Sequence, residues 1–251
     1  MPLMRRRTGS AITAAAGLVA VAIVAFANLA QDATVVERQV LVPAATSEAP
    51  GAVAPESPAP AAPIRTDTGD ALAQLEQLTI AEPFSTKKYV RDYFGQRWAD
   101  VDRNGCDTRN DILARDLTDI TFKPGTHDCV VLSGVLYDRY TEETVQFVRV
   151  SQGYQPAQAD HVVSLYVGWI SGAEGWTPEK REQFANDPLN LQITTANQQK
   201  GEFTPSRWMP TSATAACEFS ARYVMVLYAY DLTIAAVDAA ALRSTLTSCS
   251  A

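Results

Sequence analysis

The chain has few histidines, and its cysteines are widely separated. Its 251 residues include two histidines, His127 and His161, and four cysteines. No two cysteines have the short spacing of a zinc knuckle, so a zinc site of that kind is not predicted. No internal repeat is visible either. One of the two histidines, His161, directly follows an aspartate in an apolar stretch, and it is therefore the first candidate for chemistry.

Basic residues are also in short supply. The chain carries 21 Lys and Arg against 28 Asp and Glu, which gives a formal net charge of −7, and residues 80–251 keep an acidic excess. A protein that binds nucleic acid mainly through charge would be basic. Tight, processive binding is therefore disfavoured, whereas a distributive enzyme working through a local metal site is still allowed.

The N-terminus has the pattern of an export signal. Three arginines (residues 5–7) precede an apolar run over residues 11–30. Such a basic start before an apolar run is typical of a signal peptide, and Ala25-Phe26-Ala27 offers a cleavage site. The run is also long enough to cross a bilayer as an uncleaved anchor. Both alternatives place the rest of the chain outside the cytoplasm, secreted or on the outer face of the membrane.

Residues 31–68 predict an extended linker. They lack periodicity and are rich in Ala and Pro, so they cannot bury enough apolar surface to offset the entropy of ordering. Leu72, Leu75 and Leu78 then follow at helical spacing within residues 70–79. We expect the folded domain to begin there and to span residues 69–251.

The four cysteines lie in the exported part of the chain, where disulfides form more readily than metal sites. Three connectivities are possible. We favour Cys106–Cys129 with Cys217–Cys249, because each of these pairs closes a modest local loop.

The secondary-structure pattern is that of an α+β domain, a small antiparallel sheet followed by helices. Strand-like runs cover residues 119–122, 129–137 and 144–150, with turn residues between them. A helical turn is expected over residues 112–117, with Asp111 as its N-cap. Further helices are expected over 164–171, 178–186 (Pro178 suits the first helical position), 196–201, 213–230 and 235–247.

The chemistry-bearing residues follow that sheet. An imidazole that activates water, with an adjacent carboxylate that holds a divalent cation, suffices for phosphodiester hydrolysis. We consider the Asp160-His161 pair together with Asn190 and Asn197, which lie downstream, as one candidate site. These residues stand in a framework that resembles the HNH endonuclease superfamily, and more narrowly the secreted bacterial HNH-family proteins. The resemblance covers about residues 86–249 and is carried by residues 89–95, 98–113, 128–134, 160–163, 184–191 and 197–200.

The resemblance implies a ββα-metal finger and a role for each residue. His161 would be the general base, and Asp160 and Asn197 would coordinate the cation. Asn190 would hold the finger and the imidazole in place, and Lys200 would contact a phosphate oxygen. Such oxygen ligands suit Mg²⁺, with Mn²⁺ as the alternative. The substrate implied is nucleic acid, either DNA or RNA. No partner protein is predicted, and membrane contact is expected only through an uncleaved N-terminal segment.

Two other features are candidates. Asp100, Asp102, Asn104 and Asp111 fit a calcium-binding loop. Asp111 stands where a bidentate Glu is usual and Asp107 where an apolar residue is usual, so a disulfide-braced turn is the favoured alternative. Arg109 would suit a bidentate phosphate contact, and an ordinary ion pair is the alternative.

Several positions depart from the family pattern. Residues 164–171 and 224–230 are largely apolar where relatives carry acidic or lysine side chains. The leading hypothesis is an exported, metal-dependent, non-specific endonuclease, with these departures weakening its activity. The alternatives are a catalytically silent, disulfide-stapled surface domain that keeps the finger as scaffold, and a calcium-stabilised cell-envelope module.

Overall fold

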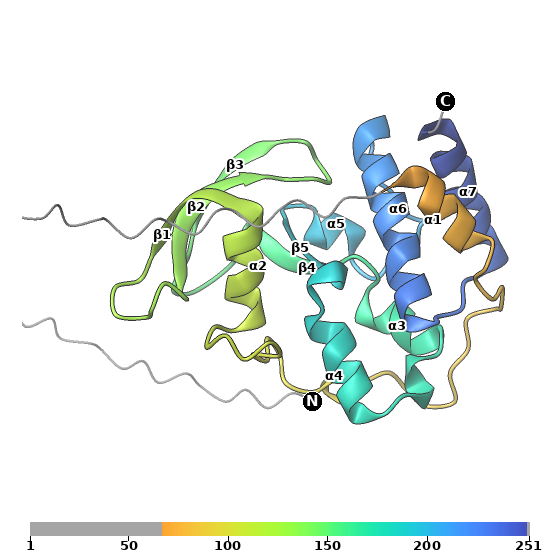
Figure 1. Cartoon of the computed structure of the whole chain (residues 1–251), viewed down its shortest axis with the longest axis horizontal. Coiled ribbons are helices and arrows are strands. Elements are labelled where there is room, and N and C mark those ends of the chain that lie inside the picture. The colour runs from red at the N-terminus through yellow and green to blue at the C-terminus, as the bar shows by residue number, and fades with distance from the viewer. Residues whose placement is uncertain (1–66, 250–251) are drawn as a thin grey trace, which may run out of the picture. The chain divides into compact units, whose positions relative to one another are not determined.

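The computed structural model describes residues 67–249 (Figure 1). The predicted export segment and all but the last two residues of the predicted linker lie outside this range. Among the described residues, no helix has the length and apolar character needed to cross a membrane. The fold is α+β, as predicted. Its elements in chain order are α1 (Thr68–Leu75), η1 (Arg91–Phe94), α2 (Thr108–Asp116), β1 (Leu117–Phe122), β2 (Val131–Tyr137), β3 (Thr144–Val148), β4 (Gln158–His161), α3 (Leu165–Ile170), η2 (Ala173–Gly175), α4 (Pro178–Asn186), η3 (Pro188–Asn190), β5 (Leu191–Thr194), α5 (Asn197–Lys200), α6 (Ala213–Tyr230) and α7 (Ala236–Cys249).

The first half of the fold is a three-stranded antiparallel sheet in the order β1-β2-β3. Helix α2 packs against β1 and β2 of this sheet (Figure 1). Ile112 and Leu113 of α2 pack with Leu136 and Phe147 of the sheet in one buried cluster. Leu191 and Ile193 of β5 join the same cluster, so the sheet also supports the second, two-stranded hairpin.

The second half is helical. α6 is a largely apolar helix that packs against α1 and α7 (Figure 1). Its buried side chains, with those of α3 and α4, form the larger core of the protein. Val162 and Val163, directly after β4, belong to this helical core. The β4–β5 hairpin is therefore fixed between two separate apolar cores.

The strand and helix predictions agree with the structure to within a few residues, except at α2. We expected a helical turn over residues 112–117 capped by Asp111. The helix instead begins at Thr108, because the carboxylate of Asp107 accepts a hydrogen bond from the Asn110 amide at 2.9 Å. The Asp111 cap is thus wrong, and α2 is a full helix of nine residues.

Both favoured disulfides are confirmed. Cys106–Cys129 joins the loop before α2 to the turn before β2, and Cys217–Cys249 joins α6 to the end of α7. No free cysteine remains in the described part of the chain. Each bridge therefore fixes one of the two cores: the first on the sheet side, the second on the helical side.

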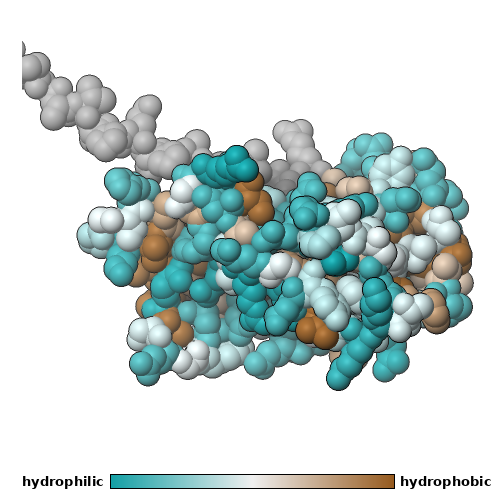
Figure 2. All heavy atoms as spheres, turned by 90° about the horizontal axis from the view of Figure 1, so that it is seen from below, coloured by the Kyte–Doolittle hydropathy of each residue, from teal (hydrophilic) through white to brown (hydrophobic). Residues whose placement is uncertain are grey.

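Most of the surface drawn in Figure 2 is hydrophilic, and its apolar residues form small, separate patches. Scattered apolar residues are normal on a soluble surface and indicate no particular partner.

Candidate active site

The predicted finger is present as a ββα unit. β4 and β5 pair antiparallel, with His161 opposite Leu191 and Asp160 opposite Gln192, and the short helix α5 follows β5. The two strands are separated by about thirty residues of helical chain. This pairing brings Asp160, His161 and the start of α5 to one place, although no short-range sequence pattern links them.

Asn190 closes the hairpin beside His161. It is fully buried, its Oδ1 accepts the Val163 amide at 2.8 Å, and its Nδ2 donates to the Val163 carbonyl at 3.1 Å. Its own backbone carbonyl accepts the Val162 amide. All these contacts are to backbone, so Asn190 fixes the chain directly after His161. The role predicted for Asn190 in placing the imidazole itself stays a prediction.

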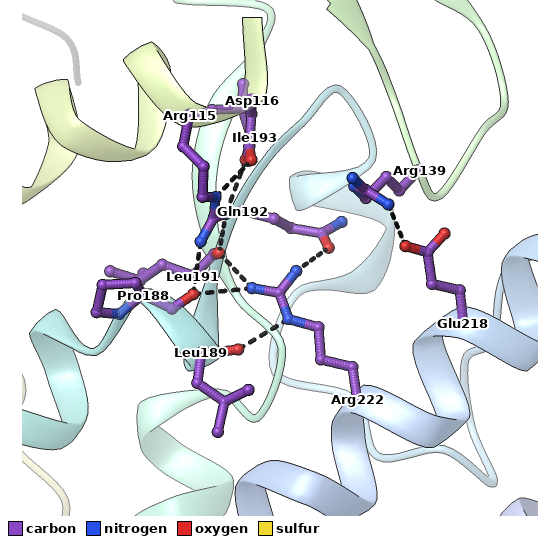
Figure 3. Close-up of polar contacts among 10 residues, drawn as sticks. All are labelled: Arg115, Asp116, Arg139, Pro188, Leu189, Leu191, Gln192, Ile193, Glu218 and Arg222. Atoms are coloured by element: carbon purple, nitrogen blue, oxygen red, sulfur yellow. Dashed lines mark hydrogen bonds and ion pairs between the residues drawn. The ribbon is translucent and has the colours of Figure 1, made fainter. Parts of the chain in front are cut away.

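Two arginines hold the segment that carries Asn190, from opposite sides (Figure 3). Arg115 of α2 donates to the carbonyls of Pro188 and Leu191 at 2.7 and 2.6 Å. Arg222 of α6 donates to the same two carbonyls and to that of Leu189. Each arginine comes from a different core, so the two guanidinium groups join the cores through the backbone before and at the start of β5.

Asp160 lies at the centre of a buried polar cluster. Its carboxylate is 3.2 Å from the ammonium of Lys200, and it accepts hydrogen bonds from Nδ2 of Asn197 at 3.1 Å and Oη of Tyr140 at 3.4 Å. Lys200 also donates to the carbonyl of His161 at 2.7 Å. Burial raises the pKa of Asp160, while the charge of Lys200 opposes that rise. The cluster ties β4 to α5.

Lys200 is therefore not at the surface, where a phosphate contact was expected. Its side chain is fully buried, and its ammonium is engaged by Asp160 and by the backbone of His161. The helical spacing from Asn197 correctly places both residues on one side of α5. That side faces the buried carboxylate.

His161 is oriented by a backbone carbonyl and an indole. Its Nε2 lies 2.9 Å from the carbonyl oxygen of Ala185, at the end of α4, and its ring stacks on Trp98 with centroids 6.3 Å apart. A carbonyl oxygen can only accept, so Nε2 carries the hydrogen and Nδ1 keeps the lone pair in the neutral ring. This tautomer leaves Nδ1 available to accept a proton.

The surroundings of His161 keep the ring neutral. Burial lowers the pKa of His161 to about 3, the Ala185 carbonyl opposes this, and the positive charges of Arg91 and Lys200 lower it further. At neutral pH the imidazole is therefore unprotonated and can accept a proton, although a pKa this far below the working pH makes it a weak base.

Asp160 and His161 line a cavity of about 150 Å³ together with Tyr89, Arg91, Ser164, Leu165, Asn197, Gly201 and Glu202. The lining includes two carboxylates and the amide of Asn197, whose Nδ2 is turned to Asp160. Such hard oxygen donors fit one Mg²⁺ ion, which usually takes one or two carboxylates and leaves the rest of its coordination to water and phosphate. Within residues 67–249, no group of three or more His, Cys, Asp or Glu side chains is arranged to hold a metal ion. A cation in this cavity would therefore need water, phosphate or the Asn197 amide as further ligands.

The acidic loop is closed by its own hydrogen bonds. The Asn104 amide donates to Asp100 and Asp102, and Nδ2 of Asn104 donates to Asp102 and Asp111. Burial raises the pKa of Asp111, and the neighbouring aspartates add to the rise while the Asn104 hydrogen bond opposes it. The carboxylates thus bond within the loop, and calcium binding there stays a prediction. Arg109, on α2, is not among the residues that line the cavity.

Several supporting residues were not predicted. The buried carboxylate of Asp138, after β2, accepts hydrogen bonds from Thr194 and Thr195 and so fixes the end of β5. Trp98, Tyr140, Arg115 and Arg222 were missed as well. Each contacts the site from an element distant in sequence, so no spacing pattern connects them to His161. Only Arg222 offered a usable signal in the sequence, because it is a charged residue within a long, largely apolar helical run.

Comparisons with known proteins identify the family of this chain. Residues 107–232 match the family described as GmrSD restriction endonucleases, C-terminal domain. An uncharacterized secreted protein of Arthroderma benhamiae is 31% identical over 201 residues, covering 78% of this chain and 93% of that protein. No solved structure matches the chain. The HNH resemblance is thereby confirmed, and the chain belongs to the family of GmrSD restriction endonuclease C-terminal domains, an endonuclease domain of the HNH/GmrSD type.

Proposed function

We propose that the protein is an exported, metal-dependent endonuclease that hydrolyses phosphodiester bonds of DNA, with RNA as the alternative substrate. The observation that carries this proposal is the state of His161. The imidazole donates its Nε2 hydrogen to the Ala185 carbonyl, which leaves Nδ1 as the base, and His161 lines one cavity with the buried carboxylate of Asp160. The membership in an endonuclease family supports the same chemistry.

In the proposed reaction, Nδ1 of His161 takes a proton from a water molecule as its oxygen attacks phosphorus. The bond to the leaving oxygen breaks, and that oxygen is protonated by solvent. Asp160 and Asn197, with Glu202 at the same cavity, would hold a divalent cation, most simply Mg²⁺. When bound, such an ion stabilises negative charge on the phosphate. Asn190 keeps the imidazole in place by fixing the chain directly after it.

Export is part of the proposal. The N-terminal pattern, two disulfides and a relative described as secreted all support it. No sequence-reading module is evident in the described residues, so we propose non-specific cleavage.

The test is a comparison of two histidines. The full chain, with both disulfides formed, is incubated with supercoiled plasmid, linear DNA and RNA in Mg²⁺, Mn²⁺ or EDTA. We expect metal-dependent cleavage that falls by about 100-fold or more in His161→Ala, since a general base contributes about that much. His127→Ala is the matched control. His127 is exposed in the turn before β2 and should be dispensable.

A second function predicts a different result. The acidic net charge and the apolar stretch over residues 164–171 favour a silent binding domain that keeps the finger as scaffold. If the folded wild-type protein leaves every substrate intact with every metal, that alternative replaces the nuclease.

A further inference from the structure

Arg91 is a cation without a partner. It opens η1, its side chain is half-buried, and its Nη1 is buried with no hydrogen-bond partner. Among residues 67–249 only two other buried side-chain atoms lack a partner, and both belong to neutral glutamines, Gln74 and Gln192. A buried charged donor left unsatisfied is unfavourable and therefore requires an explanation.

Two more deeply buried arginines near the site show what a structural role looks like. Arg115 pairs with Asp116 and two carbonyls, and Arg222 donates to three carbonyls and to Gln192. Lys200, the other cation near the cavity, is paired with Asp160. Arg91 forms no such contact in the described chain. A purely structural role for its guanidinium is therefore not supported.

Arg91 faces the reacting groups. It lines the same cavity as Asp160, His161 and Asn197, and its positive charge contributes to the low pKa of His161. Burial lowers the pKa of Arg91, and the charge of Arg97 adds to this, while Asp92 and Glu202 act in the opposite direction without forming an ion pair. The cavity thus contains an unneutralised positive charge next to the general base.

The segment that carries Arg91 is held in place from both sides. Phe94 of η1 is buried in the helical core, and Tyr93 stacks on Trp169 with ring centroids 5.1 Å apart. Arg181 of α4 donates to the Tyr93 carbonyl at 2.8 Å. The guanidinium is therefore presented by a fixed backbone, which lowers the entropy that a ligand would have to remove.

We propose that Arg91 binds a non-bridging oxygen of the scissile phosphodiester and holds it beside His161. A guanidinium provides planar, always charged donors that match phosphate oxygens, and a phosphate would satisfy the donor that the protein leaves unpaired. This inference rests on the proposed function, since it assigns the substrate contact of that same site. It makes Arg91 a substrate-binding residue, in the role first expected for Lys200.

The experiment measures binding without cleavage. In the full-length His161→Ala protein with EDTA, affinity for a fluorescein-labelled DNA duplex is followed by anisotropy over a range of salt concentrations. Adding Arg91→Gln should weaken binding by about ten-fold or more and reduce the salt dependence by about one phosphate contact. Arg91→Lys should restore part of the affinity, because a lysine keeps the positive charge but lacks the paired, planar N–H donors of the guanidinium. Melting temperature should stay unchanged or rise, since an unpaired buried charge has been removed.

The matched control is Arg97→Gln, which removes the same charge from an exposed position of the same segment outside the cavity. It should leave the affinity almost unchanged. Equal losses in the two variants would overturn the inference, because the loss would then reflect general charge. Unchanged binding in Arg91→Gln would overturn it as well. Cleavage by the wild-type protein is measured separately: binding lost in Arg91→Gln with no wild-type cleavage would keep the phosphate site and reject the nuclease, whereas cleavage with unchanged binding would reject only the role of Arg91.

Discussion

Lys200 and Asp160 form an ion pair inside the finger. The lysine side chain is fully buried and Asp160 is 5% exposed, so neither charge is compensated by water. Their mutual attraction must offset the desolvation of both groups. The hydrogen bonds that Tyr140 and Asn197 donate to Asp160, and the one that Lys200 donates to the His161 carbonyl, contribute to that balance. The pair therefore matters for stability as well as for the placement of the carboxylate.

We predict that Lys200→Met destabilises the folded protein by about 3–5 kcal/mol, because it leaves the Asp160 carboxylate buried without its counter-charge. The measurement is urea unfolding in EDTA at neutral pH. The double variant Asp160→Asn with Lys200→Met removes both charges and should be more stable than Lys200→Met alone. A Lys200→Met protein as stable as wild type would contradict the structural assignment of this pair.

Some of the site residues could be predicted from the sequence, and others could not. Asp160, His161, Asn190 and Asn197 were identified because they match a family framework, and the structure brings three of them to one cavity with Asn190 behind it. Lys200 was expected to contact a phosphate oxygen, whereas its side chain is buried against Asp160. Helical spacing gives the direction of Lys200 relative to Asn197 but does not show what the side chain faces. Arg91 lies seventy residues before His161, and no local pattern connects the two.

At the scale of elements, the long periodic segments were predictable and the short strands were not. α4 and α6 match their expected ranges, because Pro178 and a long apolar run define them. β4 and β5 have four residues each and pair across a long helical insertion. Strands of that length have no usable periodicity, so only the family framework indicated the hairpin.

Arg115 and Arg222 both donate hydrogen bonds to the backbone of η3 and the start of β5, and this arrangement leads to a prediction. Arg222 is 4% exposed and donates to three carbonyls, of which that of Leu189 has no second arginine. Arg222→Met should lower the free energy of unfolding by about 1–3 kcal/mol, because a buried carbonyl and Gln192 lose their donor. Amide exchange at Val162 and Val163, which bond to Asn190, should become faster as the segment loosens.

The control for this prediction is Arg243→Met. Arg243 forms an exposed ion pair with Glu76 on the helical side, and water screens such surface pairs so that they contribute little to stability. It should leave the exchange of Val162 and Val163 unchanged. Similar exchange in Arg222→Met and wild type would mean that Arg115 alone holds the segment.

At the scale of the whole molecule, the two relevant features are the acidic net charge and the two disulfides. The acidic net charge leaves little long-range attraction for nucleic acid. Binding must then come from a few local contacts such as the one proposed for Arg91. The two disulfides lie one in each core, so each core has its own covalent constraint.

That arrangement predicts how the protein responds to reduction. The bridges span 23 and 32 residues, and closing loops of that size removes about 3–4 kcal/mol of chain entropy each from the unfolded state. Cys217→Ala with Cys249→Ala should therefore lose about that amount in urea unfolding under oxidising conditions. Loss of both bridges should approach the whole stability of a domain this size, so wild type in dithiothreitol should unfold. If the fully reduced protein keeps the melting temperature of the oxidised one, the bridges are dispensable, and the covalent argument for export fails with them.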